Sequence, residues 1–144
     1  MSTTFSLSAL VYFLSLIPTV AADFIVFRAY FRTKYRHYLF IGGVWLDVTV
    51  TFFVGALALL LQNSVVGIWS FYIYLPVGFL WVCALDTMSR DAIGPGKIVV
   101  MTVSAAAVIF TSFDPQAIAP VVTWWGEAVG NPSGAFGLSV LINL

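Results

Sequence analysis

The chain has 144 residues, of which 61% are hydrophobic and only 8% are charged. A soluble domain carries roughly 25% charged residues, so this composition is typical of an integral membrane protein. Six basic and six acidic side chains cancel, which excludes the basic surface that nucleic acid binding requires. One cysteine and one histidine are too few for an internal disulfide or for a cysteine- or histidine-rich metal site.

Four apolar segments predict membrane-spanning helices, and together they indicate an all-α, polytopic helical bundle that forms one transmembrane domain over residues 1–144. The segments are residues 5–27, 38–61, 65–88 and 98–113. We expect each to cross a hydrocarbon core of about 30 Å, because a helix rises about 1.5 Å per residue. The stretch AFGLSVLINL has the character of a fifth span but covers roughly half a crossing. We interpret it as the first half of another helix of a longer protein, with a tail packed against partner subunits as the alternative, and the sequence does not decide between them.

The basic residues predict the orientation of the spans, because all of them fall in two connections. They are Arg28, Arg32, Lys34, Arg36, Arg90 and Lys97. The positive-inside rule places the loops 28–37 and 89–97 in the cytoplasm and the N-terminus outside, as in a prokaryotic cytoplasmic membrane. The first span resembles a secretory signal peptide, but no Lys or Arg precedes it, so we expect it to remain uncleaved.

Aromatic side chains mark the expected outer surface of the membrane, where Trp and Tyr rings favour the headgroup region. These membrane-interface anchors are Trp69, Tyr72, Trp124 and Trp125. The last two belong to an outer interfacial segment, residues 114–134. Here we predict a short helix over residues 117–129 that lies on the membrane. The alternative is a lid over an external pocket.

Asp47 lies about 13 Å into the second span, close to the expected midplane. Every fourth residue of this helix is small or polar, which gives the stripe Gly43, Asp47, Thr51 and Gly55. Such a stripe favours close approach of another helix, so Asp47 is predicted to face protein rather than lipid. Two alternatives follow: a protonated Asp hydrogen-bonded across a helix interface, or a proton- or cation-responsive site.

Two other acidic residues are expected near the cytoplasmic edge, each paired with a basic neighbour. Asp86 and Arg90 have the i,i+4 spacing of an ion pair on a helix surface. Asp23 and Arg28 are expected to meet by snorkelling of the arginine.

Prolines stand in the outer halves of two spans, at Pro18 and Pro76. Kinks at these positions are expected to open an outward cavity between the first and third spans. Such a cavity suits ligand sensing as well as transport.

Catalytic motifs are not found in the sequence. There is no Ser-His-Asp set, no metal-ligand cluster and no pair of haem-type histidines, and Cys83 lies in an apolar helix without a basic neighbour. We therefore predict a non-enzymatic protein. The sequence does not select a cofactor, whether pigment, quinone or lipid.

The order of features carries one resemblance to a known family. A first span leads to the basic loop RAYFRTKYRH and a polar-striped second span, and the third span reads IYLPVGFLWVCALDTMSR. This order resembles the first four helices of the seven-helix N-terminal input region of prokaryotic membrane sensor kinases. The resemblance implies a sensing function for the bundle and a cytoplasmic catalytic domain further along the natural chain.

Three functions are compatible with these observations. The first is an accessory or scaffold subunit of a larger membrane complex, such as a respiratory or photosynthetic assembly. The second is the ligand-sensing input domain of a signalling receptor, and the third is a proton- or cation-coupled transporter fragment that uses Asp47. The expected partners are the lipid bilayer and other membrane subunits, and nucleic acid is not among them.

Overall fold

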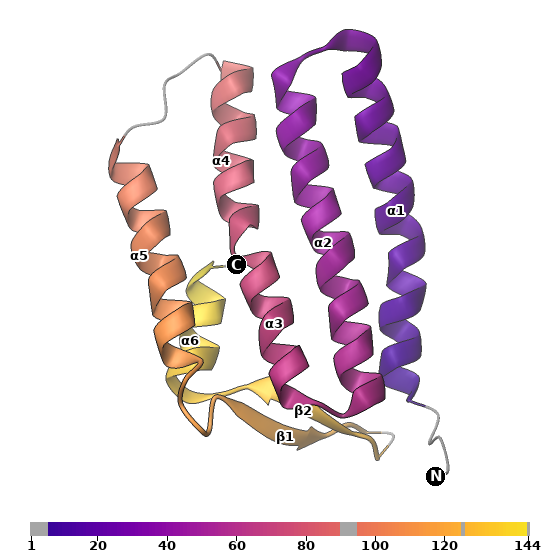
Figure 1. Cartoon of the computed structure of the whole chain (residues 1–144), viewed down its shortest axis with the longest axis vertical. Coiled ribbons are helices and arrows are strands. Elements are labelled where there is room, and N and C mark those ends of the chain that lie inside the picture. Colours follow the sequence, from indigo (N-terminus) through magenta and orange to yellow (C-terminus); the bar gives the residue numbers. More distant parts are fainter. Residues whose placement is uncertain (1–5, 90–94, 125, 144) are drawn as a thin grey trace.

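Helices make up most of the computed structural model, which describes residues 6–89, 95–124 and 126–143 (Figure 1). The described helices are α1 (Leu7–Thr33), α2 (Arg36–Leu61), α3 (Ser64–Tyr74), α4 (Pro76–Ser89), α5 (Pro95–Thr111) and α6 (Gly134–Asn143). Two strands, β1 (Ile118–Val122) and β2 (Ala128–Pro132), form a hairpin that crosses one end of the bundle (Figure 1). We call this the hairpin end, and the end with the α1–α2 turn the opposite end.

Three helical segments are long and apolar enough to cross a membrane: α1, α2, and the run Ser64–Ser89 that joins α3 and α4. The predicted first three spans coincide with these segments. Many large apolar side chains on them are exposed, among them Ile17 at 67% and Phe24 at 66%, as a surface that faces lipid requires. The predicted fourth span corresponds to α5, an apolar helix of 17 residues.

Short turns hold the long helices antiparallel. Lys34 ends α1 in the left-handed backbone conformation, with φ of 59°, and its N–H donates to the Tyr30 carbonyl. Gln62 ends α2 in the same way, with φ of 49°. The side chain of the next residue, Asn63, then accepts hydrogen bonds from the first N–H groups of α3. These caps satisfy backbone groups that helix ends leave free, so that neighbouring helices follow one another without a long loop.

The first helix extends beyond its predicted end at residue 27 and stops at Thr33. Four of the six residues after Phe27 are charged or aromatic, yet the helix continues because Arg and Ala are good helix formers and Arg32 in the last turn interacts favourably with the helix dipole. Asp23 is consequently ten residues, or about 15 Å, from the end of α1. The predicted position within about 8 Å of the membrane edge was counted from Arg28, which lies inside α1 and not at its end.

A break at Leu75 divides the third rod into α3 and α4. Pro76 is the first residue of α4 and has no N–H, so the usual hydrogen bond to the carbonyl four residues earlier cannot form. The Leu75 N–H instead donates to the Tyr72 carbonyl at 3.3 Å, one residue closer than in an α-helix. Pro76 thus interrupts the third helical segment locally.

The segment predicted to form an interfacial helix forms the β-hairpin, and the prediction of a helix is wrong. The strands pair antiparallel from Ile118↔Pro132 to Val122↔Ala128. Pro120 lies inside the expected helix, where it would remove a backbone hydrogen bond, whereas β-branched residues such as Val121 and Val122 favour a strand. Gly126, with φ of 83°, turns the chain between the strands.

A small core joins the hairpin to the helices. Val108 of α5, Ala117 and Phe136 of α6 are all at most 2% exposed, and Phe71, Leu75, Ile118 and Val140 pack against them. The rings of Phe71 and Phe136 meet edge to face, with 5.4 Å between their centroids. This core fixes α5, α6 and the start of β1 against α3.

The first prediction tests close packing of α1 against α2. A Cβ atom at Gly55 would come within 2.8 Å of the Tyr12 ring, so Gly55→Leu is expected to lower stability by about 1–3 kcal/mol through overpacking. The measurement is the midpoint of thermal unfolding in detergent, followed by tryptophan fluorescence. The control is Gly96→Leu, since no atom lies within 4 Å of a Cβ built at Gly96. Equal midpoints for both variants would contradict the predicted contact.

Candidate functional site

A cavity of about 500 Å³ lies at the hairpin end, between α1, α2, α3 and the β-hairpin. Its volume is within the range of sites that hold small molecules, about 300–1,000 Å³. Tyr12 of α1 and Leu59 of α2 contribute to one wall, Phe71 to another, and Ile118 and Pro120 to the strand that covers the cavity. The cavity is therefore bounded by segments that lie far apart in the sequence.

Polar groups gather where the helices meet the hairpin. The polar residues that line the cavity are Ser8, Gln62, Asn63, Ser64, Ser70 and Asn131. Not all of them are available to a ligand, because the Asn63 side chain caps α3 and the Ser70 hydroxyl donates to the Gly67 carbonyl at 2.6 Å. Gln62 and Asn131 supply amide groups, which can both donate and accept hydrogen bonds. The arrangement suits an amphipathic molecule with a polar end among these amides and an apolar body between the rings.

Two glycines set the width of the cavity. Gly55 lets the Tyr12 ring approach α2, and this ring also packs edge to face on Phe52 with 5.6 Å between centroids. At Gly67 a Cβ would meet only the Ala58 Cβ, at 3.9 Å, which is an ordinary contact. A Cβ atom at position 67 therefore fits at the wall of the cavity without displacing α2.

Glu127 joins the hairpin to the start of α1. Its carboxylate accepts a hydrogen bond from the Ser6 hydroxyl and another from the Ser8 N–H, the latter at 3.0 Å. Ser6 is the N-cap of α1 and accepts from the Ala9 N–H, and the first turn of α1 has no acidic residue of its own. Glu127 therefore supplies, from a distant segment, the negative charge that favours a helix N-terminus.

The turn that carries Glu127 is held by its own hydrogen bonds. The Thr123 N–H donates to the Glu127 carbonyl at 2.8 Å, and the Glu127 N–H donates to the Thr123 hydroxyl at 3.0 Å. At the other end of the hairpin, the Ser133 N–H donates to the Ala117 carbonyl at 2.9 Å. The hairpin is thus fixed to α1 at its tip and to the core around Phe136 at its base.

The predicted stripe on α2 contacts two different helices. A Cβ at Gly43 would lie 3.3 Å from Leu80 of α4, whereas Gly55 faces Tyr12 of α1. The reason is geometric: residues four apart are offset by about 40° around a helix of 3.6 residues per turn, so the stripe winds by about 120° between its ends. Asp47 and Thr51 lie between them, and each has a buried oxygen without a hydrogen-bond partner among the described residues.

Asp23 does not form the predicted ion pair with Arg28. Its carboxylate accepts a hydrogen bond from the Thr49 hydroxyl of α2, at 2.8 Å, and the one ion pair found in residues 6–89, 95–124 and 126–143 lies elsewhere. Because α1 continues to Thr33, Asp23 faces the middle of α2, where a hydroxyl is closer than any cation. This hydrogen bond joins the two helices.

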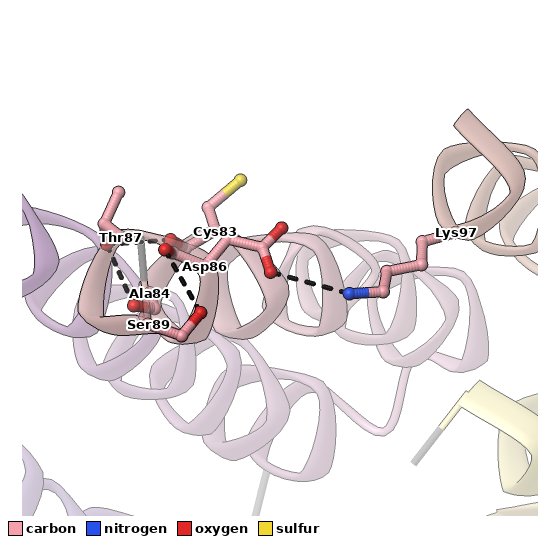
Figure 2. Close-up of polar contacts among 6 residues, drawn as sticks. All are labelled: Cys83, Ala84, Asp86, Thr87, Ser89 and Lys97. Carbon is pink, nitrogen blue, oxygen red and sulfur yellow. Dashed lines mark hydrogen bonds and ion pairs between the residues drawn. The ribbon is translucent and has the colours of Figure 1, made fainter. Parts of the chain in front are cut away.

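The ion pair found in the described residues joins α4 to α5. The Lys97 Nζ lies 3.5 Å from the Asp86 Oδ1, and Figure 2 shows the Asp86 side chain directed away from its own helix toward Lys97. Asp86 is 8% exposed, and its other oxygen has no hydrogen-bond partner among the described residues. Arg90, the predicted partner, lies outside the described residues.

The aromatic residues predicted as anchors have different surroundings. Trp69 is 57% exposed and packs edge to face on Tyr72. The Tyr72 hydroxyl is hydrogen-bonded to that of Ser112, and so connects α3 to the end of α5. Trp124 is 90% exposed on the turn of the hairpin, and Trp125 lies outside the described residues.

Sequence reasoning missed Glu127, Asn131 and Gly67 as parts of a site. The one available signal was an acidic residue in an outer segment without basic residues, and it did not indicate α1 as its partner. Within the described ranges no group of three metal-binding side chains occurs. Comparisons with protein families, with curated proteins and with solved structures find no match for this chain.

The second prediction concerns the contact between the hairpin and α1. Glu127→Ala removes both hydrogen bonds to α1. We expect the free energy of local opening of the hairpin to fall by about 1 kcal/mol, which speeds amide exchange in residues 118–132 about fivefold. Hydrogen–deuterium exchange with mass spectrometry measures it. The control is Asp114→Asn, because Asp114 is an exposed carboxylate that caps its own turn and has no contact with α1. Unchanged exchange in Glu127→Ala would show that the contact does not hold the hairpin.

Proposed function

We propose that the chain is a ligand-sensing domain of a membrane receptor, with the cavity at the hairpin end as its binding site. The observation that carries the proposal is the cavity itself, which has a volume of about 500 Å³, is lined by both apolar and polar side chains, and is bordered by the hairpin. A scaffold subunit has no need of such a cavity. The resemblance to the input regions of sensor kinases agrees with this function.

The proposed ligand is a small amphipathic molecule. Its apolar part would lie between Tyr12, Leu59 and Phe71, and its polar part would reach the amides of Gln62 and Asn131. Among the described residues, no charged side chain lines the cavity, which disfavours a strongly ionic ligand. Because the hairpin is fixed to α1 by Glu127 and to α3 through the core, a ligand that displaces the hairpin would also act on these helices.

The proposed topology has four spans, a partial fifth, and the N-terminus and the hairpin outside. Supporting this, the described basic residues belong to the last turns of α1, the α1–α2 turn and the starts of α2 and α5, which lie at the end of the bundle opposite the hairpin (Figure 1), as the positive-inside rule requires. In this orientation the cavity opens toward the external medium or the outer leaflet. Signals would then pass along the helices to the cytoplasmic side.

The third prediction tests the ligand. The chain is purified from its natural membrane in mild detergent, and mass spectrometry identifies bound small molecules and proteins. Gly67→Leu adds a side chain at the wall of the cavity, where its Cβ makes only an ordinary contact, and is expected to lose the bound molecule at least about tenfold, while the exposed Gly96→Leu retains it. Fixed protein partners and equal small-molecule content in both variants would favour the accessory-subunit alternative.

The fourth prediction tests the topology in a Cys83→Ala background. We expect Ser64→Cys and Thr123→Cys to react with a membrane-impermeant maleimide on intact cells, and Arg32→Cys to react only after permeabilisation. The reason is that the proposed chain crosses the membrane once as α3–α4 and once as α5 between positions 64 and 123. Both positions then lie on the same side. Labelling of Thr123→Cys only after permeabilisation would show that α5 does not cross.

A further inference from the structure

Two buried oxygen atoms on the same side of α2 have no hydrogen-bond partner among the described residues. They are the Asp47 Oδ2 and the Thr51 Oγ1. Because the residues are four apart, their side chains lie on neighbouring turns of one helix face. Buried polar atoms are nearly always hydrogen-bonded, so two neighbouring exceptions indicate a place where a further group binds.

Thr51 is an exception within this protein as well. Hydroxyls in its other helices donate to the carbonyl one turn earlier, which satisfies them at little cost. The threonines that do so are Thr19, Thr33, Thr87, Thr102 and Thr111, at 2.7–3.3 Å. For Thr51 the carbonyl one turn earlier is that of Asp47. The unpartnered hydroxyl and the unpartnered carboxylate oxygen therefore lie one turn apart on the same face of α2.

The packing register places this turn opposite the break between α3 and α4. Gly43 faces Leu80, and Ala58 faces Gly67, with the helices antiparallel. Counting four residues forward from Gly43 and four back from Leu80 places Asp47 level with Pro76. Counting seven residues back from Ala58 and seven forward from Gly67 places Thr51 level with Tyr74. Pro76 has no N–H and the Leu75 N–H donates to the Tyr72 carbonyl, so the Phe71 carbonyl loses its usual intrahelical donor and is a further oxygen near this level.

The chemistry of these groups favours a small monovalent cation. A carboxylate, a hydroxyl and backbone carbonyls are hard oxygen donors, which alkali cations prefer. Lys97 already pairs with Asp86, the one acidic residue of α4. With one carboxylate, a monovalent cation gives a neutral site, whereas a divalent cation would leave a charge that is costly within a membrane.

We propose that Asp47, Thr51 and the α3–α4 break form a sodium-binding site inside the helical bundle. The site is separate from the cavity at the hairpin end, because neither Asp47 nor Thr51 lines that cavity. Sodium bound here would join α2 to the interrupted helix and fix the relative position of α3 and α4.

The test is equilibrium binding of radioactive ²²Na⁺ to the full chain in nanodiscs, with choline chloride keeping the ionic strength constant, at neutral and at alkaline pH. The expected result is saturable binding that unlabelled sodium displaces and choline does not. Asp47→Asn is expected to weaken binding at least about tenfold, and Thr51→Val about threefold or more. The matched controls Asp114→Asn and Thr102→Val, at an exposed carboxylate and an exposed threonine, should bind as the natural chain does.

The outcomes separate clearly. If Asp47→Asn does not fold, Thr51→Val gives the decisive comparison, because it removes one oxygen and keeps the shape of the side chain. Absence of saturable binding by the natural chain at both pH values would overturn the proposal. Equal affinity of the natural chain and Thr51→Val, with the controls also unchanged, would place any bound sodium elsewhere.

Discussion

The position of α2 between α1 and the α3–α4 rod determines where the other parts of the molecule can be. At Gly42 and Gly55 the absence of a side chain brings α1 close, and at Gly43 it admits Leu80 of α4. Close approach of this kind is how helices associate in lipid, where burial of apolar surface gives little advantage. The same approach brings Asp23 within hydrogen-bond distance of Thr49 and positions the Tyr12 ring as a wall of the cavity.

The hairpin depends on this arrangement of helices at both of its ends. Its tip bonds to the N-terminus of α1 through Glu127, and its base packs against Phe136 and Phe71. An isolated two-stranded hairpin is only marginally stable in water. Here the carboxylate contact and the aromatic core supply the stability that the strands lack, and they hold β1 and β2 across the ends of α2 and α3.

Hydrophobicity was sufficient to locate the three long apolar helical segments, although α1 continues beyond its apolar run to Thr33. It was insufficient for features that depend on contacts between distant residues. The strands around Pro120 were read as an interfacial helix, since the aromatic and apolar composition suits either structure and the pairing with residues 128–132 has no local signal. Likewise, the partner of Asp23 could not be chosen correctly without knowing that α1 continues to Thr33.

The candidate site was anticipated only in outline. A proline in the third span suggested an outward cavity, and a cavity occurs between the helices and the hairpin, but its polar edge comes from Gln62 and Asn131, which no motif marks. Asp47 was singled out from its depth in the second span and from the stripe of small and polar residues on its helix. The missing partner of Thr51 became apparent only when its hydroxyl could be compared with those of the other helical threonines.

The two-residue turn between α1 and α2 has a consequence for how the chain reaches its membrane. Because α1 ends at Thr33 and α2 begins at Arg36, two residues connect the two apolar helices. Such a short connection requires that they enter the membrane side by side. They can partition from the translocation channel into lipid as a single helical hairpin. In that case the Asp23 carboxylate enters the membrane already hydrogen-bonded to Thr49, and the energetic barrier that a lone acid would meet during biogenesis is reduced.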